Sequence, residues 1–237
     1  MRRSAPVTPG KGLAASLIGA GEMAGHVVTG PLLHRYRTRW GASPSDVELA
    51  LPGDELIPGW GWGSTRAVRI DRRPDQVWPW IVQLGQGRGG FYSLEGLERL
   101  VGCQIRNIGH IEPAWQELAV GDPIRLHPKA PPLRVVQCSA PTDLVLAGVP
   151  DPPRSEEHGN GRRDPERVAP RADVRWSFHL RPAGASSTRL IERHRVRRPT
   201  SPAERLSFGP YLLDPVSFVM SRHLLRNVAT LAQRQPR

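Results

Sequence analysis

Apolar and polar residues alternate along several short runs in the middle and second half of the chain, which is typical of strands with one buried face. The clearest run is 174–180, where every second residue is apolar. Similar runs, separated by turn residues, cover 64–71, 123–126, 133–138, 143–147 and 188–196. Hairpins of this kind predict an antiparallel sheet with one buried face and one face in water. His179 shares the polar face of its run with Arg175 and Arg181, so we expect it to be solvated.

Three other segments carry apolar residues at helical spacing. Residues 75–84 form an apolar face that consists of Val77, Trp80, Ile81 and Leu84. A shorter helix follows Ser93, which we expect to cap it. The last helix is the longest, with Asp214 as the expected cap, Pro215 at its first position and an apolar stripe along one side. The predicted order is therefore one strand, two helices, several antiparallel strands and one long helix.

A glycine cluster at 85–90 separates the first two helices. Glycines at its first, third and sixth positions match the dinucleotide fingerprint G-x-G-x-x-G. That fingerprint requires a strand before it and a helix after it, whereas here a helix precedes the glycines. We therefore expect no dinucleotide and no other cofactor. The glycines instead allow a tight turn with positive φ, which would place Arg88 and Tyr92 at the entrance of a cavity.

The net charge is +11 over 237 residues, but its distribution does not favour a nucleic-acid partner. Only Lys11 and Lys129 are lysines, and the arginines are spread over many segments, whereas a surface that follows phosphates needs them on one face. We expect no nucleic-acid binding and, at most, a weak attraction to anionic membrane surfaces. Neither the histidines nor Cys103 and Cys138 have metal-ligand spacing, so no metal site is predicted. We expect two free thiols in a reducing cytoplasm.

The N-terminus and one internal segment differ in composition from the rest. Residues 1–35 are predicted to be a tail followed by a loosely packed helix. Its apolar stretch, 13–33, includes an acidic residue, a histidine and several glycines, so we expect it to lie on the domain or on a membrane surface rather than to span a bilayer. Residues 36–237 are predicted to form one domain. Within it, 150–172 contains almost no apolar residue and is predicted to be a disordered insertion loop.

Three segments resemble the SRPBCC superfamily of START-like or polyketide-cyclase-like helix-grip proteins, and within it an uncharacterised bacterial subgroup. They are RWGASPSDVELALPGDEL at 39–56, VWPWIVQLGQGRGGFYSLEGLERLVG at 77–102 followed by Asn107 and 111–122, and the final helix at 214–233. The resemblance implies an α+β helix-grip fold, in which a curved antiparallel sheet wraps around a long C-terminal helix, with two short helices after the first strand. It also implies a cavity for a hydrophobic ligand between the sheet and that helix.

The ligand implied by this cavity is a hydrophobic small molecule such as a lipid, a polyketide or an aromatic metabolite. Pockets for such ligands are mostly apolar with few polar groups. The residues that we expect to contact the ligand are Trp80, Leu84, Arg88, Tyr92, Leu97, Trp115, Trp176, Phe178, Phe218 and Met220.

Glu192 and His194 share the predicted inward face of their strand. An apolar cavity would raise the pKa of the glutamate and tune that of the histidine, so the pair is a candidate catalytic dyad for proton transfer. The alternatives are a satisfied polar patch or a strand edge exposed to water. Binding of a hydrophobic molecule is therefore one hypothesis. Two others are a cyclase or dehydratase that uses Glu192, His194, Tyr92 or Arg88, and a membrane-associated accessory protein tethered through its N-terminal segment.

Overall fold

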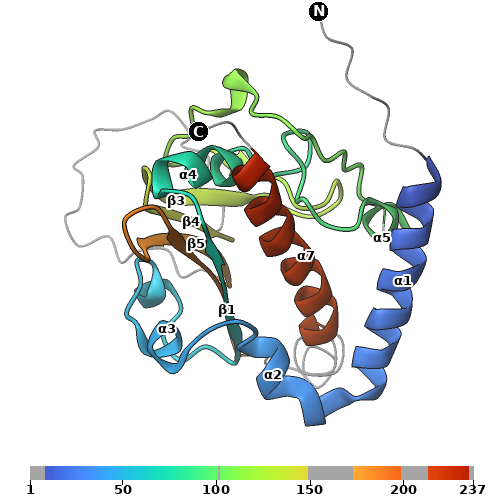
Figure 1. The fold of residues 1–237 in the computed structure, drawn as a ribbon. Helices are drawn as coiled ribbons and strands as arrows, with labels where there is room; N and C mark the ends of the chain where they lie inside the picture. The colour runs from blue at the N-terminus through green and yellow to red at the C-terminus, as the bar shows by residue number, and fades with distance from the viewer. Residues whose placement is uncertain (1–8, 101, 149–172, 199–212, 235–237) are drawn as a thin grey trace, which may run out of the picture.

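The computed structural model describes residues 9–100, 102–148, 173–198 and 213–234. Within these ranges the centre of the fold is a six-stranded antiparallel sheet (Figure 1). Its strands are β1 (Trp62–Ile70), β2 (Pro123–Ile124), β3 (Leu133–Ser139), β4 (Asp143–Ala147), β5 (Val174–Pro182) and β6 (Thr188–Val196). They follow the order β1-β6-β5-β4-β3-β2, so the first strand pairs with the last and forms one edge of the sheet.

Helix α7 (Leu213–Arg234) lies across one face of this sheet and contacts β1 and α4 (Figure 1). Between β1 and β2 the chain forms α4 (Pro74–Val82), α5 (Glu95–Leu100) and the 3-10 helix η3 (Pro113–Trp115). The predicted α+β helix-grip fold is therefore confirmed: a sheet packs against one long C-terminal helix, and two short helices follow the first strand.

The glycine cluster between α4 and α5 forms a tight turn, as predicted. Gly85 and Gly90 exchange two backbone hydrogen bonds of 3.0 and 3.1 Å, and their φ angles are 134° and 84°. A Cβ atom at Gly90 would lie 2.3 Å from Oδ1 of Asn107, so a larger residue does not fit there. A helix, not a strand, leads into the turn, which removes the structural basis of a dinucleotide site.

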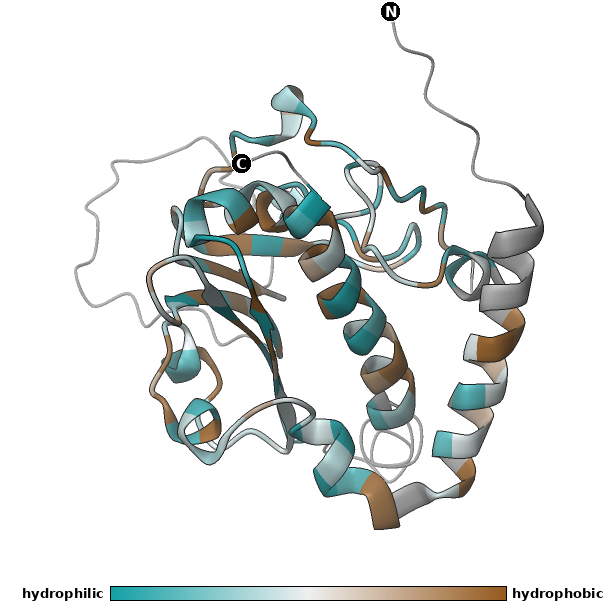
Figure 2. Cartoon of the chain, in the orientation of Figure 1, coloured by the Kyte–Doolittle hydropathy of each residue, from teal (hydrophilic) through white to brown (hydrophobic). Residues whose placement is uncertain are grey.

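The inner face of the sheet, which faces α7, holds the main hydrophobic core. Ile81 of α4, Phe178 and Leu190 of the sheet, and Leu225 and Val228 of α7 are completely buried. Burial of each such side chain contributes about 1.5–3 kcal/mol to the free energy of unfolding. Hydrophobic and hydrophilic residues interleave along α7, so the helix presents an apolar side to the sheet (Figure 2).

The outer face of β5 and β6 is also covered, by α3 (Pro44–Glu48) and the 3-10 helix η2 (Asp54–Leu56). The carboxylate of Asp54 pairs with Nη2 of Arg175 and Nη1 of Arg193, at 2.6 Å each. His179 is completely buried, with its Nδ1 2.6 Å from Oδ1 of Asp143. The prediction that His179 is solvated is wrong, because alternation along a strand identifies a face but not the segments that cover it.

The N-terminal helix α1 packs against α7 and α5. The elements before β1 that have not yet been introduced are α1 (Pro9–Val28), the 3-10 helix η1 (Gly30–Leu33) and α2 (His34–Thr38). Glu22 pairs with Arg222 of α7, and the ring of His26 lies edge-on to that of Phe218 with their centres 4.8 Å apart. No helix in the described ranges is long and apolar enough to cross a membrane. Residues 1–8 of the predicted tail and the whole predicted insertion at 150–172 lie outside the described residues.

Candidate functional site

A cavity of about 340 Å³ lies between the inner face of the sheet and α7. Its apolar lining residues are Trp62, Phe91, Leu126, Val174, Trp176, Val196, Met220 and Leu224. Its polar lining residues are Ser93, His194, Ser217 and Ser221. Sites for small molecules commonly measure roughly 300 to 1,000 Å³ and are mostly apolar with a few polar groups. The cavity therefore has the chemistry of such a site and a volume near the lower end of the range.

One wall of the cavity is a stripe along α7. Its lining residues are spaced i, i+3, i+4 and i+7 and therefore face the same direction: Ser217, Met220, Ser221 and Leu224. The opposite wall comes from alternate residues of β5 and β6, with Trp62 at the start of β1. Regular elements form these two walls, and the loop residues Phe91, Ser93 and Leu126 complete the lining.

Trp176 is the central aromatic residue of the sheet wall. Its indole stacks on the ring of His194, with the ring centres 5.4 Å apart and the planes 12° from parallel. Its centre is also 4.8 Å from that of Phe178 and 5.9 Å from that of Phe91. The indole Nε1 donates a 2.7 Å hydrogen bond to Oε1 of Glu192. Ring packing and this hydrogen bond together hold the indole in one orientation.

Glu192 is completely buried behind Trp176 and Ser221. Its Oε1 also accepts a 3.0 Å hydrogen bond from Ser221, whereas its Oε2 has no hydrogen-bond partner in the described part of the chain. Arg66 donates 2.9 Å hydrogen bonds to the hydroxyls of Ser217 and Ser221, which connects it to the same network. Burial raises the pKa of Glu192, and the charge of Arg66 and the two hydrogen bonds only partly offset this rise.

His194 lies between this network and the cavity. Burial, together with the positive charges of Arg66, Arg175 and Arg195, holds its pKa well below the ordinary value, so the imidazole is neutral at pH 7. A neutral imidazole offers one donor and one acceptor, and its Nδ1 has no hydrogen-bond partner among the described residues. Nδ1 is 3.9 Å from Oε1 of Glu192, beyond hydrogen-bonding distance. Both side chains point inward, but a catalytic role for this dyad stays a prediction.

Two of the residues predicted to bind the ligand, Trp176 and Met220, line the cavity. Three others are buried in the core beside it and do not line it: Trp80, Leu84 and Phe178. Trp115, at the end of η3, is half-buried and does not line the cavity either. The side chain of Leu97 lies outside the described residues.

Phe218 points away from the cavity. Its ring centre lies 5.6 Å from that of Tyr36 and 6.5 Å from that of Trp40, so it packs toward α2 and the segment that follows it. Phe218 and Met220 are two residues apart, which places them roughly 200° apart around a helix. The prediction that both contact one ligand therefore conflicts with helical geometry, and the structure places only Met220 at the cavity.

Arg88 and Tyr92 do not lie at the entrance of the cavity, and that prediction is wrong. Tyr92 is 2% exposed, and its hydroxyl accepts a 2.6 Å hydrogen bond from Nε2 of Gln83. Burial raises the pKa of Tyr92 to about 12. Nη2 of Arg88 donates to the carbonyl oxygens of Val82 and Trp115, at 3.1 and 2.9 Å. The tight turn folds both side chains back onto α4 and η3, where they hold the loops together.

Several lining residues were missed in the sequence. Trp62 was missed because the first strand was predicted to begin at Ser64. Extending the alternation back by two residues places Trp62 on the inner face, together with Arg66. The serines of α7 carry a clearer signal, since Ser217 and Leu224 lie three and four residues from Met220 on one helix face.

Metal-binding groups do not cluster in this site. Across the described ranges, no three His, Cys, Asp or Glu side chains lie close enough together to hold a metal ion. Cys103 and Cys138 are both free thiols.

No family model and no curated protein matches the chain. Among solved structures, an HSP90 activator from Plasmodium falciparum is similar with a TM-score of 0.40 and 12% identity, over 72% of this chain and 95% of that chain. A polyketide-cyclase-like protein from Corynebacterium glutamicum is similar with a TM-score of 0.29 and 11% identity, over 72% and 89%. A truncated norcoclaurine synthase from Thalictrum flavum is similar with a TM-score of 0.33 and 9% identity, over 74% and 95%. All three TM-scores are below 0.5, so the helix-grip assignment rests on the strand order and on the position of α7.

Proposed function

We propose that this protein binds a small, largely apolar molecule in the cavity between the sheet and α7. The observation that carries the proposal is the cavity itself, about 340 Å³ in volume, with aromatic and aliphatic side chains on both walls. Water in such a space finds few hydrogen-bond partners. A ligand that replaces it gains about 25 cal/mol for each Å² of apolar surface removed from water. The ligand class is therefore a lipid fragment, a polyketide or an aromatic metabolite.

The polar lining favours a ligand with one uncharged hydrogen-bonding group. His194 lines the cavity and is neutral, so its imidazole is an uncharged polar group beside the ligand. Ser93 lies in the same lining and donates only a weak 3.3 Å contact to the sulfur of Met220. A charged group would lose its hydration among the apolar residues without a compensating charge in the lining.

A neutral fluorescent probe tests the proposal. N-phenylnaphthylamine is apolar and uncharged, and its emission rises on transfer from water to an apolar site. We expect saturable binding to the full-length protein. The substitution Leu126→Trp, which adds volume in the lining, should weaken binding roughly tenfold or more. The matched control is Leu118→Trp, because Leu118 is also partly buried and packs on the same core but does not line the cavity.

Two results would contradict the proposal. One is a wild-type protein that binds no probe and retains no small molecule in native mass spectrometry after purification without detergent. The other is equal loss of binding in the Leu126→Trp and Leu118→Trp variants, which would place the probe outside the cavity.

A second candidate function, contact with a membrane surface, rests on the exposed apolar residues of α1 and η1. Leu17, Ile18, Val28 and Leu32 are 65%, 72%, 86% and 91% exposed, and the chain carries a net charge of +11. Exposed apolar side chains on a helix, in a protein with a net positive charge, favour anionic lipid surfaces. Sedimentation with phosphatidylserine-containing vesicles should show binding that a Leu17→Glu/Ile18→Glu variant loses. A Leu49→Glu variant, altered at an exposed residue after α3, should keep it. Vesicle binding that is unchanged by the double substitution would exclude this role of α1.

A further inference from the structure

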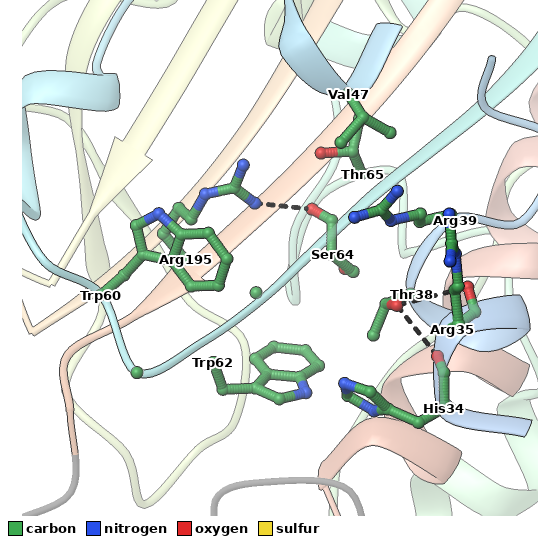
Figure 3. Close-up of a pocket in the computed structure, with 12 residues that line it drawn as sticks. His34, Arg35, Thr38, Arg39, Val47, Trp60, Trp62, Ser64, Thr65 and Arg195 are labelled. Atoms are coloured by element: carbon green, nitrogen blue, oxygen red, sulfur yellow. Dashed lines mark hydrogen bonds between the residues drawn. The ribbon is translucent and has the colours of Figure 1, made fainter. Parts of the chain in front are cut away.

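Trp62 also lines a second pocket, about 510 Å³ in volume, on the edge of the sheet formed by β1 (Figure 3). The other walls come from α2 and the residue after it, from α3 and from Arg195 of β6. The apolar cavity and this pocket share Trp62 but differ in every other lining residue.

Positive charge dominates the second pocket. Its lining includes Arg35, Arg39, Arg195 and His34, and no aspartate or glutamate. Arg35 and Arg39 are exposed, and their guanidinium groups form no hydrogen bond or ion pair within the described ranges. The guanidinium group of Arg39 extends toward Ser64 of β1 (Figure 3). Unbalanced positive charge in a concave surface raises the local concentration of anions.

Arg195 contributes a guanidinium group whose position is fixed. Its Nη1 donates to the carbonyl oxygens of His194 and Ser64 at 2.8 and 3.2 Å, and its central carbon lies 4.4 Å from the ring centre of Trp60. Its Nε and Nη2 form no hydrogen bond to the described residues. Burial and two neighbouring arginines lower the pKa of Arg195 to about 10, so it stays charged at pH 7. A bound anion would offset the repulsion among these charges.

Aromatic and imidazole groups complete the pocket. Nδ1 of His34 is 3.1 Å from Oδ2 of the buried Asp214, which holds the ring at the pocket wall. Nε1 of Trp62 is buried without a hydrogen-bond partner in the described residues and points toward His34 (Figure 3). Trp60 is 45% exposed and offers a flat apolar surface beside Arg195. The pocket thus combines several cationic donors with aromatic rings.

We propose that this pocket binds the acidic group, a carboxylate or a phosphate, of a soluble small molecule. The planar fork of an arginine matches two oxygens of either group, and three arginines converge on this pocket. A volume of about 510 Å³ exceeds that of a bare ion, so the organic part of the ligand has space against Trp60 and Trp62. This site is separate from the proposed function of the apolar cavity.

The test uses inorganic phosphate and acetate, titrated at constant ionic strength into the full-length protein and followed by calorimetry. The variant Arg35→Ala/Arg39→Ala removes two exposed charges and should fold normally. The control, Arg99→Ala/Arg234→Ala, removes two exposed arginines of α5 and α7 outside the pocket. Both variants reduce the net charge by two, from +11 to +9. We expect saturable binding by the wild type and the control, and binding roughly tenfold weaker or lost in the Arg35→Ala/Arg39→Ala variant.

Three results would overturn the proposal. The first is no saturable binding of either anion by the wild type. The second is equal weakening in both double variants, which would indicate general attraction to a basic protein. The third is binding to phosphatidylserine-containing vesicles through Arg35 and Arg39 without binding of the free ions, which would assign the pocket to a lipid headgroup. Phosphate and acetate do not need the apolar cavity, so their result is independent of the N-phenylnaphthylamine result.

Discussion

The two faces of strands β5 and β6 both bury carboxyl groups, yet the pKa values of these groups shift in opposite directions. On the inner face, burial raises the pKa of Glu192 above its ordinary value despite the nearby Arg66. On the outer face, burial also acts to raise the pKa values of Asp54 and Asp143. There it is outweighed by hydrogen bonds and neighbouring positive charges, and both pKa values are lowered.

The difference lies in the partners that each face provides for its buried carboxyl groups, and in the cavity that only the inner face adjoins. Asp54 pairs with two arginines, Arg175 and Arg193, and Asp143 pairs with Arg181 and also contacts the buried imidazole of His179. Both faces keep buried polar atoms without hydrogen bonds. On the outer face these include Oδ1 of Asp54 and the guanidinium nitrogens of Arg175, which form an ion pair with each other. On the inner face they are Oε2 of Glu192 and Nδ1 of His194, which lie beside a cavity. Unsatisfied buried polar atoms are costly, so they are expected where a ligand or a reaction uses them. We therefore look for function on the inner face.

The largest expected effect is on the outer face, from the substitution Asp54→Ala. It leaves Arg175 and Arg193, which are 0% and 1% exposed, without their shared carboxylate. Removing one partner of a buried ion pair costs about 3–5 kcal/mol. Because the side chain of Asp54 is 32% exposed, we expect a loss of about 2–4 kcal/mol in the free energy of unfolding. Urea denaturation measures this loss.

Asp71→Ala is the matched control for that measurement. Asp71 also pairs with an arginine of the sheet, Arg69, but both side chains are largely exposed. We expect this variant to unfold at nearly the urea concentration of the wild type. If Asp54→Ala were equally harmless, the outer layer would not be the stabilising one, and the contrast between the two faces would fail.

The next largest effect is expected at Glu192, where two substitutions separate its roles. Glu192→Ala removes the acceptor of Trp176 and Ser221 and should cost about 2 kcal/mol, because part of the loss is offset by removal of an unfavourably buried acid. Glu192→Gln keeps an acceptor oxygen and should stay within about 1 kcal/mol of the wild type. Probe binding should survive in Glu192→Gln and weaken in Glu192→Ala, since Trp176 then loses its fixed orientation.

A Glu192→Gln variant that binds the probe as well as the wild type but loses a reaction found for the wild type would instead support the acid-base role of Glu192. Equal damage by both substitutions would show that the charge itself holds the cavity together, contrary to the geometry of the network.

The dependence of stability on pH should have opposite signs on the two faces. The pKa of Asp143 is lowered in the folded protein. Its carboxylate therefore contributes fully to stability above the unfolded pKa of 3.8, and this contribution is lost as the pH falls through the folded pKa. The pKa of Glu192 is raised, so stability declines as the pH rises from 4.5 through the folded value. The loss in the free energy of unfolding caused by Asp143→Asn should therefore be smaller in acid than at neutral pH. The free energy of unfolding of Glu192→Gln, relative to that of the wild type, should rise by about 1 kcal/mol toward neutral pH. Parallel pH profiles of the two variants would contradict the comparison.

Much of the fold could be predicted from the sequence because it depends on periods that neighbouring residues reveal. Alternation placed Trp176, Glu192 and His194 on the inner face, and the spacing of the final helix identified its apolar side. The cover over the outer face could not be predicted in this way. It comes from residues 44–56, which are more than a hundred positions before the strands β5 and β6 that they cover. The alternation within a strand does not indicate which distant segment packs on it.

The candidate site was less predictable than the fold. Alternation indicated that Trp176 faces inward, but the volume beside it depends on how far α7 stands from the sheet, which no local pattern encodes. Large aromatic residues such as Trp80 and Phe178 fill space as readily as they line it, and here they fill it. The prediction that Tyr92 lies at the entrance of the cavity failed for a related reason: a tight turn brings its side chain back into the core.

The smallest expected effect compares a serine on the outer face of the sheet with a serine of the cavity lining. Ser177 on the outer face is completely buried, and its hydroxyl lies 2.9 Å from Nε2 of His179 and donates to the carbonyl of Arg193. Ser177→Ala leaves a buried imidazole nitrogen unpaired and should cost about 1 kcal/mol in urea denaturation. Ser93→Ala, in the loop that lines the cavity, loses only the weak contact with Met220 and should cost less than about 0.5 kcal/mol. The same substitution should favour the binding of fully apolar probes over hydroxylated ones. If Ser93→Ala proved as destabilising as Ser177→Ala, the polar groups of the cavity lining would have a structural role. They would then give no support to the proposal of a bound ligand.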